Sequence, residues 1–484
     1  MQLKVVFKMI GRLLVVLGLG MLLPLVVGLY YGEKDAFVFL ICVPFTVFSG
    51  FLLSRLCQTD KNIRTKDGFA IATYGWLLAS FFGMLPYLLS GSVHGVLNAY
   101  FETMAGFSTT GCSIIDDVEV LSHSILLWRS MTQWFGGMGI LVLFVALLSS
   151  ASGSSQLYRA EMPGIVTEKL TPRISDNAKI MWLIYLILTL GSFIVFVFCG
   201  MPLFDALCHA FTTVSTGGFS IKNASLGYYQ SNALENAVTL FMFLSAINFA
   251  VYYRTFFSQQ KLKTFFKTTE VRAYFIISLI FAALISFDLF INGDFSLLDS
   301  LQKGTFQIIS IITTTGFVIS DFELWPSFSL ALIIIAFFCG GCTSSTSCSI
   351  KIDRYVILFR QAYADIQRYL HPRLVTRQKI NNNVIPETIV ISVGTFFFLM
   401  LFLVAVSTLI FAFLGLNLLE SFTVAASTLC NIGLSVDTFG PTESYAAMPV
   451  FGKVWMIVLM LLGRLEIYTV LAVLVPSKLK SRKK

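Results

Sequence analysis

The sequence has few charged residues. Asp, Glu, Lys and Arg make up 12% of its 484 residues, whereas soluble domains carry roughly 25%. So little charge excludes an ordinary water-soluble domain. Hydrophobic residues make up 56% of the chain, and runs long enough to cross about 30 Å of hydrocarbon recur along it. We expect ten membrane spans, at residues 10–31, 36–55, 69–91, 125–149, 179–200, 233–253, 272–292, 327–350, 386–415 and 454–475.

The sequence also lacks the motifs of several enzyme classes. It has no P-loop signature, no acidic motif suited to an aspartyl-phosphate, and no nucleophile–base or metal-ligand constellation. Nine cysteines lie mostly in or beside apolar runs without zinc-ligand spacing, and four histidines are scattered. We therefore expect no enzyme activity, and any energy source or regulator must belong to another chain.

Basic residues are concentrated in alternate connections between the spans. With a cytoplasmic N-terminus, the inner segments hold 28 of the 34 Lys and Arg residues but 9 of the 26 acidic ones. This positive-inside pattern predicts that both termini are cytoplasmic. The basic N-terminal run has no cleavage site after it, so we expect a retained first span. The basic inner face suits contact with anionic membrane lipid, and nothing indicates nucleic-acid binding.

Four short stretches rich in Gly, Ser and Thr interrupt the hydrophobic sequence: "GFSTTGCS", "VSTGGFS", "ITTTGFV" and "LCNIGLS". They align on Gly111, Gly218, Gly316 and Gly433, at intervals of 107, 98 and 117 residues. Each follows a run of some 11–13 residues, and a helix of about 12 residues rises only about 18 Å. Such a helix does not cross the bilayer, so we expect a re-entrant half-span.

The half-spans are expected to begin thirteen positions before each glycine. Asn98, Asp205 and Glu420 at these positions suit a helix start, whereas Lys303 does not. The sequence thus predicts an all-α polytopic membrane protein. It has four pseudo-symmetric units of span, pore helix, Gly-rich segment and span, after an N-terminal two-helix unit.

Non-helical backbone at membrane depth persists only where it is buried in protein or lines a wet cavity. Four such segments around one axis can present carbonyl oxygens that replace the water shell of a cation. The half-helices would point their negative ends toward the same cavity. None of the four stretches contains Lys or Arg, which disfavours an anion path. The alternative is that the stretches are re-entrant turns with a packing role only.

Several motifs together resemble a known family. They are the four stretches above with "MTQWFGGMGI" (131–140), "YRAEMPG" (158–164), "LTPRISD" (170–176), "FFCGGC" (337–342) and "LLGRLEIYT" (461–469). In this order the chain resembles the Trk/Ktr/HKT superfamily of potassium transporters, and within it the bacterial TrkH/TrkG membrane subunits.

The resemblance implies a single filter that binds K⁺ through backbone carbonyls. Matched onto this sequence, the ion-binding residues are Thr109, Thr110, Thr216, Gly217, Thr314, Thr315, Asn431 and Ile432. The filter glycines are Gly111, Gly218, Gly316 and Gly433. Glycine at all four positions points to K⁺ (and Rb⁺), with incomplete exclusion of Na⁺. The resemblance also implies a bacterial cytoplasmic membrane location, a homodimer and a cytosolic nucleotide-binding regulatory subunit.

The eighth predicted span is interrupted by "FFCGGCTSSTSCSIK", residues 337–351. Paired glycines and Ser/Thr hydroxyls that compete for backbone hydrogen bonds weaken a helix. The resemblance implies an intramembrane gating loop here. Its candidate residues are Gly340, Gly341, Thr343, Ser344, Ser345 and Thr346. The alternative is a kinked helix whose hydroxyls face other helices.

Arg464 lies near the middle of the tenth predicted span, where a charge is costly and usually functional. The resemblance places it in the pore below the filter, as a barrier to K⁺. The alternative is an ion pair with an acid on a neighbouring helix; Glu466 does not share its helix face. For the glycines of 131–140 we expect close helix packing rather than a dinucleotide site.

The predicted units are 1–60, the N-terminal pair; 61–165, 166–262, 263–352 and 385–484, the four pore units; and 353–384, a basic cytosolic linker. The connection 351–387, which holds seven basic residues, is a candidate docking surface for the regulatory subunit. The alternative is an ordinary positive-inside loop. Two alternatives to a potassium uptake protein remain at this stage. One is the K⁺-translocating subunit of a P-type ATPase complex, and the other is an H⁺- or Na⁺-coupled K⁺ symporter.

Overall fold

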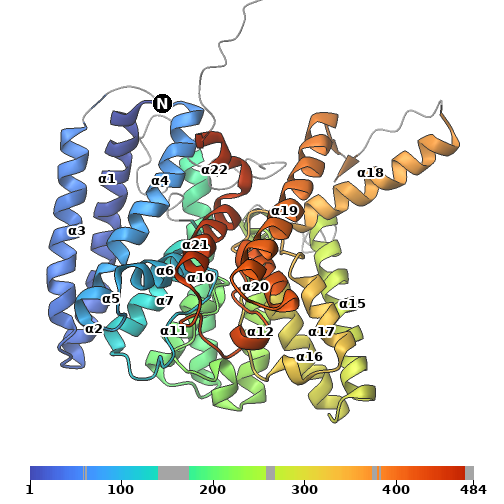
Figure 1. The fold of residues 1–484 in the computed structure, drawn as a ribbon, viewed down its shortest axis with the longest axis horizontal. Coiled ribbons are helices and arrows are strands. Elements are labelled where there is room, and N and C mark those ends of the chain that lie inside the picture. The colour runs from blue at the N-terminus through green and yellow to red at the C-terminus, as the bar shows by residue number, and fades with distance from the viewer. Residues whose placement is uncertain are drawn as a thin grey trace, which may run out of the picture.

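The structure is a computed structural model that describes residues 1–57, 59, 63–139, 174–257, 268–372, 379–380 and 383–474. The regular secondary structure of the described residues is helical except for one short antiparallel pair, β1 (Lys379–Ile380) with β2 (Asn383–Val384), and an isolated bridge between Cys339 and Ile350. Most long helices run side by side in one bundle (Figure 1). The predicted all-helical membrane-type architecture is therefore confirmed at this level.

An N-terminal unit lies at one edge of the bundle (Figure 1) and consists of α1 (Leu3–Gly20), α2 (Leu22–Tyr30) and α3 (Ala36–Leu56). Gly11 of α1 faces Gly50 of α3 so closely that a Cβ on either would lie 2.5 Å from the other's carbonyl oxygen. Small residues at this crossing let the two backbones touch, which is how helices associate in lipid.

The same order of elements then occurs four times: a long helix, a short helix, an extended segment and a second helix. The first unit has α4 (Thr65–Gly83), α5 (Leu85–Ser90), α6 (Val96–Phe107) and α7 (His123–Gly137). The second has α10 (Ile174–Phe198), α11 (Leu203–Val214), α12 (Asn232–Ser245), α13 (Phe249–Tyr252) and a π-helix (Tyr253–Phe257). The third has α15 (Thr269–Asn292), α16 (Leu297–Ile312), α17 (Ser327–Ala336) and α18 (Ile352–Leu370).

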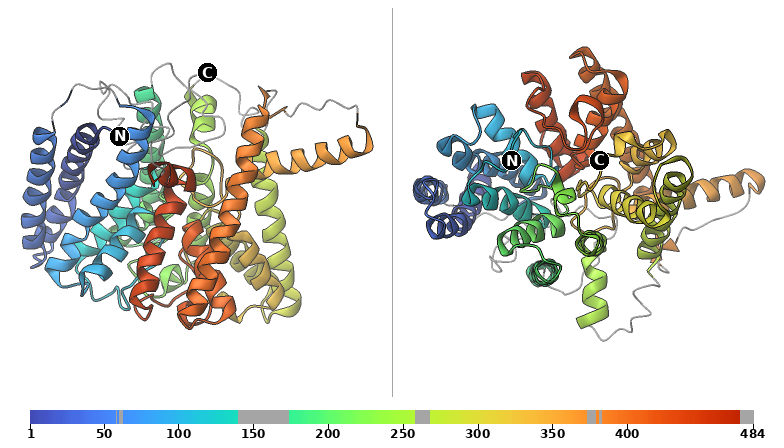
Figure 2. Two further views of the ribbon diagram at one scale, coloured as in Figure 1. Left: turned by 45° about the horizontal axis from the view of Figure 1, so that its top comes forward. Right: turned by 90° about the horizontal axis from the view of Figure 1, so that it is seen from below.

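The fourth unit has α19 (Glu387–Phe413), α20 (Leu418–Cys430), α21 (Val450–Leu465) and α22 (Ile467–Leu474). Seen from below, the four units surround a common centre in chain order, and α18 extends sideways from them (Figure 2). The exact unit boundaries predicted from the sequence stay predictions.

The described residues contain six helices long and apolar enough to cross a membrane, or up to eight if each bent pair is one span. Two predicted spans were wrong as straight helices. In place of 233–253, α12 and the helix from Phe249 meet at 90°; in place of 454–475, α21 and α22 meet at 110°. The count of ten spans stays a prediction, because residues 140–173 lie outside the described ones. The motif 158–164 and most of 170–176 fall in that range.

The short helices α6, α11, α16 and α20 have 12, 12, 16 and 13 residues. Three begin where the sequence predicted, with Asn98, Asp205 and Glu420 in their first turns. The start at Lys303 was wrong, because α16 begins at Leu297, where Ser296 caps it by accepting a hydrogen bond from the Asp299 amide. Lys303 instead lies inside α16, with its ammonium 4.2 Å from the Phe295 ring centroid.

Candidate ion-conducting site

The four Gly-rich segments have the same backbone conformation. The residue two positions before each glycine is in the left-handed region, with φ of 56° at Thr109, 53° at Thr216, 58° at Thr314 and 55° at Asn431. The glycines have φ of 80° at Gly111, 80° at Gly218, 81° at Gly316 and 86° at Gly433. A non-glycine residue with positive φ is uncommon, so four at equivalent positions identify one motif used four times.

Hydrogen bonding at the end of each short helix explains this conformation. The amide just before each glycine donates to the carbonyl five residues earlier: Thr110 to Ala105 at 3.0 Å, Gly217 to Thr212 at 2.9 Å, Thr315 to Ser310 at 2.8 Å and Ile432 to Ser427 at 3.0 Å. This six-to-one bond with a left-handed residue is a Schellman-type helix end. It stops each helix and turns the chain.

The four segments meet in a closed ring. A Cβ would lie 2.5 Å from the Gly217 oxygen if built on Gly111, 1.9 Å from the Thr315 oxygen on Gly218, 2.2 Å from the Ile432 oxygen on Gly316, and 2.2 Å from the Thr110 oxygen on Gly433. Each glycine thus touches the carbonyl that precedes the glycine of the next unit, and the fourth closes on the first. Only a residue without a side chain permits this approach.

The candidate ligand residues are buried at this ring. Thr109, Thr110, Thr216, Thr314, Thr315 and Asn431 are each 0% exposed, and Ile432 is 1% exposed. The Asn431 amide is 2.6 Å from Thr110 Oγ1 and 3.3 Å from the Ser108 carbonyl, so the fourth segment holds the first. The Cys112 thiol, which the sequence did not explain, lies 3.8 Å from the Gly433 carbonyl. It is therefore part of the same contact between the first and fourth segments.

Two hollows adjoin the ring. One is lined by Gly111, Gly218, Gly316 and Gly433 together with polar and acidic residues that include Asp116 and Glu443. The other is lined by residues 343–345, 347–349, Lys351 and Arg464. Thr109 is not among the residues that line the first hollow, and its hydroxyl accepts a hydrogen bond from Arg464, which lines the second. The first Gly-rich segment therefore lies between the two hollows.

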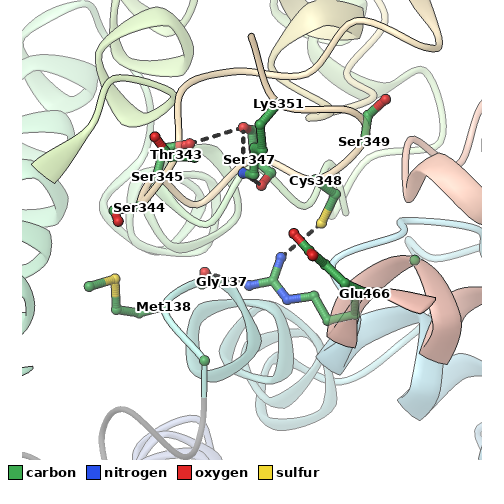
Figure 3. A pocket seen from close by; sticks show the side chains of 13 residues that line it. Gly137, Met138, Thr343, Ser344, Ser345, Ser347, Cys348, Ser349, Lys351 and Glu466 are labelled. Carbon is green, nitrogen blue, oxygen red and sulfur yellow. Dashed lines mark hydrogen bonds between the residues drawn. The ribbon is translucent and has the colours of Figure 1, made fainter. Parts of the chain in front are cut away.

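Residues 337–351 form a non-helical loop, hereafter the hairpin, along the second hollow (Figure 3). Its two ends run parallel where Cys339 is bridged to Ile350. The Gly340 amide donates to the Ile350 carbonyl at 2.9 Å, and the Ile352 amide donates to the Gly341 carbonyl at 3.1 Å. The kinked helix considered as an alternative is absent, since α17 ends at Ala336 and α18 begins at Ile352.

The hairpin is fastened to the bend between α12 and α13. The Cys342 amide donates to the Ala246 carbonyl at 2.9 Å, and Thr346 Oγ1 donates to the Ser245 carbonyl at 3.0 Å. The Ser344 carbonyl accepts the Phe249 amide at 3.2 Å. At the bend, backbone amides and carbonyls lack the hydrogen bonds that a straight helix would give them. The hairpin supplies hydrogen-bond partners for these groups.

Further hydroxyl contacts fix the hairpin from other sides. Thr343 Oγ1 donates to Glu270 at the start of α15, at 2.6 Å. Ser345 and Ser347 hydroxyls lie 3.0 Å apart, and the Ser347 hydroxyl accepts the Gly341 amide at 3.0 Å. The Thr343 and Thr346 hydroxyls thus bond groups on two other helices, the Glu270 carboxylate of α15 and the Ser245 carbonyl of α12.

Arg464 joins the first Gly-rich segment to the hairpin. Its guanidinium donates to Thr109 Oγ1 and Cys348 Sγ, both at 2.9 Å, and to the Thr346 carbonyl at 3.2 Å. It also donates to the carbonyls of Gly136 and Gly137 at the end of α7. Gly137 lies across the hollow from the hairpin residues Thr343–Ser345 (Figure 3).

No carboxylate pairs with Arg464 among the residues that the structure describes. Glu466, at the bend between α21 and α22, pairs instead with Arg354 of α18 at 2.6 Å. This bend has φ of 59° at Glu466. Arg464 is therefore in the last turn of α21 rather than in the middle of a straight span, and its ligands are neutral.

The glycines of 131–140 pack closely, as predicted. A Cβ on Gly136 would lie 1.8 Å from the Phe107 carbonyl, and one on Gly137 would lie 2.5 Å from Ser215 Cβ. The end of α7 therefore lies against the ends of the short helices α6 and α11.

Sequence reasoning missed a buried ion pair between α6 and α7. Arg129 Nε donates to Glu102 at 2.7 Å, and the two side chains are 3% and 0% exposed. Arg129 also donates to the Ser220 carbonyl at 2.6 Å and lies 3.6 Å over the Phe219 ring. The signal was present, because Arg129 is a charge inside the predicted span 125–149 and Glu102 lies in a half-span.

A family model described as TrkH, cation transport protein, matches residues 36–483. The chain belongs to the TrkH family. One similar protein is the Trk system potassium uptake protein TrkH of Halomonas elongata, which is 34% identical over 484 residues with 99% of each chain covered. Another is the Trk system potassium uptake protein TrkG of Escherichia coli K12, which is 34% identical over 473 residues with 97% of each chain covered.

A solved structure of a TrkH protein has the same fold. The crystal structure of the potassium transporter TrkH from Vibrio parahaemolyticus superimposes with a TM-score of 0.90 at 32% identity, covering 99% of this chain and 100% of that one. The resemblance drawn from the motifs is thereby confirmed. As a member of the TrkH family the chain is a membrane transport protein and not an enzyme.

Proposed function

We propose that this chain takes up K⁺ across the bacterial cytoplasmic membrane through the ring of four Gly-rich segments. The observation that carries the proposal is the cyclic set of close contacts between each filter glycine and the carbonyl of the next unit. The proposed ligands for the dehydrated ion are the backbone oxygens of Thr109 and Thr110 and of the equivalent pairs in the other three segments. The potassium-uptake names of the full-length relatives support K⁺ as the substrate.

The surroundings of the ring favour a cation. The C-terminal ends of four short helices point at it, and these ends carry partial negative charge. Asp116 and Glu443 line the adjoining hollow, which we assign to the outer side on the positive-inside pattern. On this assignment both termini face the cytoplasm.

The hairpin 337–351 and Arg464 form the proposed gate on the inner side. A fixed guanidinium beside Thr109 raises the electrostatic barrier for a departing cation, and the hairpin occupies the path below it. Opening requires release of the contacts to Thr346 and Cys348. We propose that a cytosolic nucleotide-binding subunit drives this release in a homodimeric complex, as the family resemblance implies.

Ion flux into proteoliposomes tests the proposal. We expect ⁸⁶Rb⁺ uptake that K⁺ inhibits at much lower concentrations than Na⁺, driven by a membrane potential without ATP. Equal inhibition by K⁺ and Na⁺, or no flux above protein-free liposomes, would contradict it.

Proton coupling has a weaker basis. Glu466, the acid in the tenth predicted span, is paired with Arg354, and Asp288 of α15 accepts hydrogen bonds from the Ser329 amide and hydroxyl. Both carboxylates have structural partners. We therefore expect the flux to follow the K⁺ gradient and the potential when no pH gradient is imposed.

A further inference from the structure

Gln133 of α7 holds the filter segment of the neighbouring unit. Its Nε2 donates to the Gly217 carbonyl at 2.6 Å, and its Oε1 accepts the Phe219 amide at 3.0 Å. The two bonds span Gly218, and the side chain is 0% exposed. We propose that Gln133 is a positioning residue that sets K⁺/Na⁺ selectivity by fixing the Gly217 carbonyl; this inference rests on the proposed function.

The two Gln133 hydrogen bonds form a clamp on the second segment. The clamp explains why this segment has a glycine, Gly217, before its filter glycine. The equivalent residues in the other units are Thr110, Thr315 and Ile432, all with side chains. At Gly217 a Cβ would lie 2.4 Å from Gln133 Cδ. The carboxamide of Gln133 therefore occupies the volume that a side chain takes in the other three segments.

The clamp also makes the four carbonyls of the ring chemically different from one another. Of the four carbonyls that touch filter glycines, Gly217's is the one with a side-chain amide donor within the described part of the chain. A carbonyl that accepts such a bond has a fixed direction and offers less negative potential to an ion. Selectivity between K⁺ and Na⁺ depends on the number, field strength and freedom of these dipoles.

Helix α7, which carries Gln133, is itself held in place by contacts on both sides of this residue. Arg129, one helical turn before Gln133, bonds the Ser220 carbonyl of the same segment. Arg464 bonds the carbonyls of Gly136 and Gly137, one turn after it. Because α7 is held on both sides of Gln133, the carboxamide has little freedom to follow a moving carbonyl.

Gln133→Met tests the proposal, because methionine keeps most of the volume and removes both hydrogen bonds. We expect ⁸⁶Rb⁺ uptake to remain but its discrimination between K⁺ and Na⁺ as inhibitors to fall about tenfold, which is the effect of losing two modest hydrogen bonds. Gln307→Met is the matched control: Gln307 is buried in α16, and neither of its amide atoms has a partner in the described structure. It should leave the discrimination unchanged.

A second pair of variants keeps the proposal testable if Gln133→Met does not fold. Gly217→Ala should abolish selective uptake, because the added methyl meets Gln133, and Gln133→Ala with Gly217→Ala should restore part of the uptake. Unchanged discrimination in Gln133→Met, equal loss in Gln307→Met, or no recovery in the double variant would overturn the assignment. A wild-type protein that does not discriminate K⁺ from Na⁺ would instead overturn the proposed function.

Discussion

At the residue scale, the filter glycines combine two constraints that are separable. Each has a positive φ, and each touches a neighbouring carbonyl. A glycine that has only the first constraint is Gly91, with φ of 73° and no atom within 4 Å of an added Cβ. Comparing the two kinds of site distinguishes backbone strain from crowding of the ion path.

Gly111→Ser should therefore lower both the rate of K⁺ uptake and the preference for K⁺ over Na⁺ by about tenfold or more. The serine Cβ would lie 2.5 Å from the Gly217 oxygen and displace it. ⁸⁶Rb⁺ flux with Na⁺ competition measures both quantities. Gly91→Ser should change neither, and an unaltered Gly111→Ser protein would show that the filter assignment is wrong.

Arg464 is the second residue whose role is testable alone. Arg464→Ala removes a charge from the path and the contacts to Thr109, Thr346 and Cys348, so we expect K⁺ flux without a regulatory subunit to rise several-fold. Arg464→Lys keeps the charge and loses the fork geometry, and should give an intermediate rise. Flux equal to wild type in the alanine variant would rule out the barrier.

At the scale of elements, the ion pair between α6 and α7 braces two filter segments. Arg129→Met should destabilise the fold by about 3–5 kcal/mol, because it leaves the Glu102 carboxylate buried without its partner. Glu102→Gln combined with Arg129→Met should be less destabilised than Arg129→Met alone. Thermal unfolding in detergent measures the difference, and simple additivity of the two changes would contradict a paired role.

The elements also show what the sequence could predict. The short helices and their glycines were visible because length and composition are local properties, and the hairpin 337–351 was visible because seven of eight residues at 343–350 are Ser, Thr or Cys. The bends after Ser245 and at Glu466 were not visible. They are stabilised by partners such as Thr346 and Arg354, which lie about a hundred residues away in the chain.

Gln133 was missed for a similar reason. In the sequence it is one polar residue among glycines and aromatics in a predicted span. Its role depends on Gly217 and Phe219, which are brought to it by the packing of α7 on α11. Long-range contacts of this kind have no local pattern.

At the scale of the whole molecule, the charge around the outer hollow should govern how K⁺ arrives. Asp116→Asn with Glu443→Gln should raise the K⁺ concentration for half-maximal uptake about two- to fivefold at low ionic strength, and less at high salt because of screening. Asp365→Asn on the exposed face of α18 is the control. An equal effect at low and high salt would contradict electrostatic attraction.

The ring of contacts has a consequence for synthesis. Its last contact joins Gly433 to Thr110, and the guanidinium that bonds Thr109 belongs to residue 464. A ribosome-bound chain that ends before the fourth unit therefore has three filter segments and no closed ion path. Gly433 and Arg464 are only about thirty residues apart, so on the proposed function the ion path and its barrier are completed almost together during synthesis.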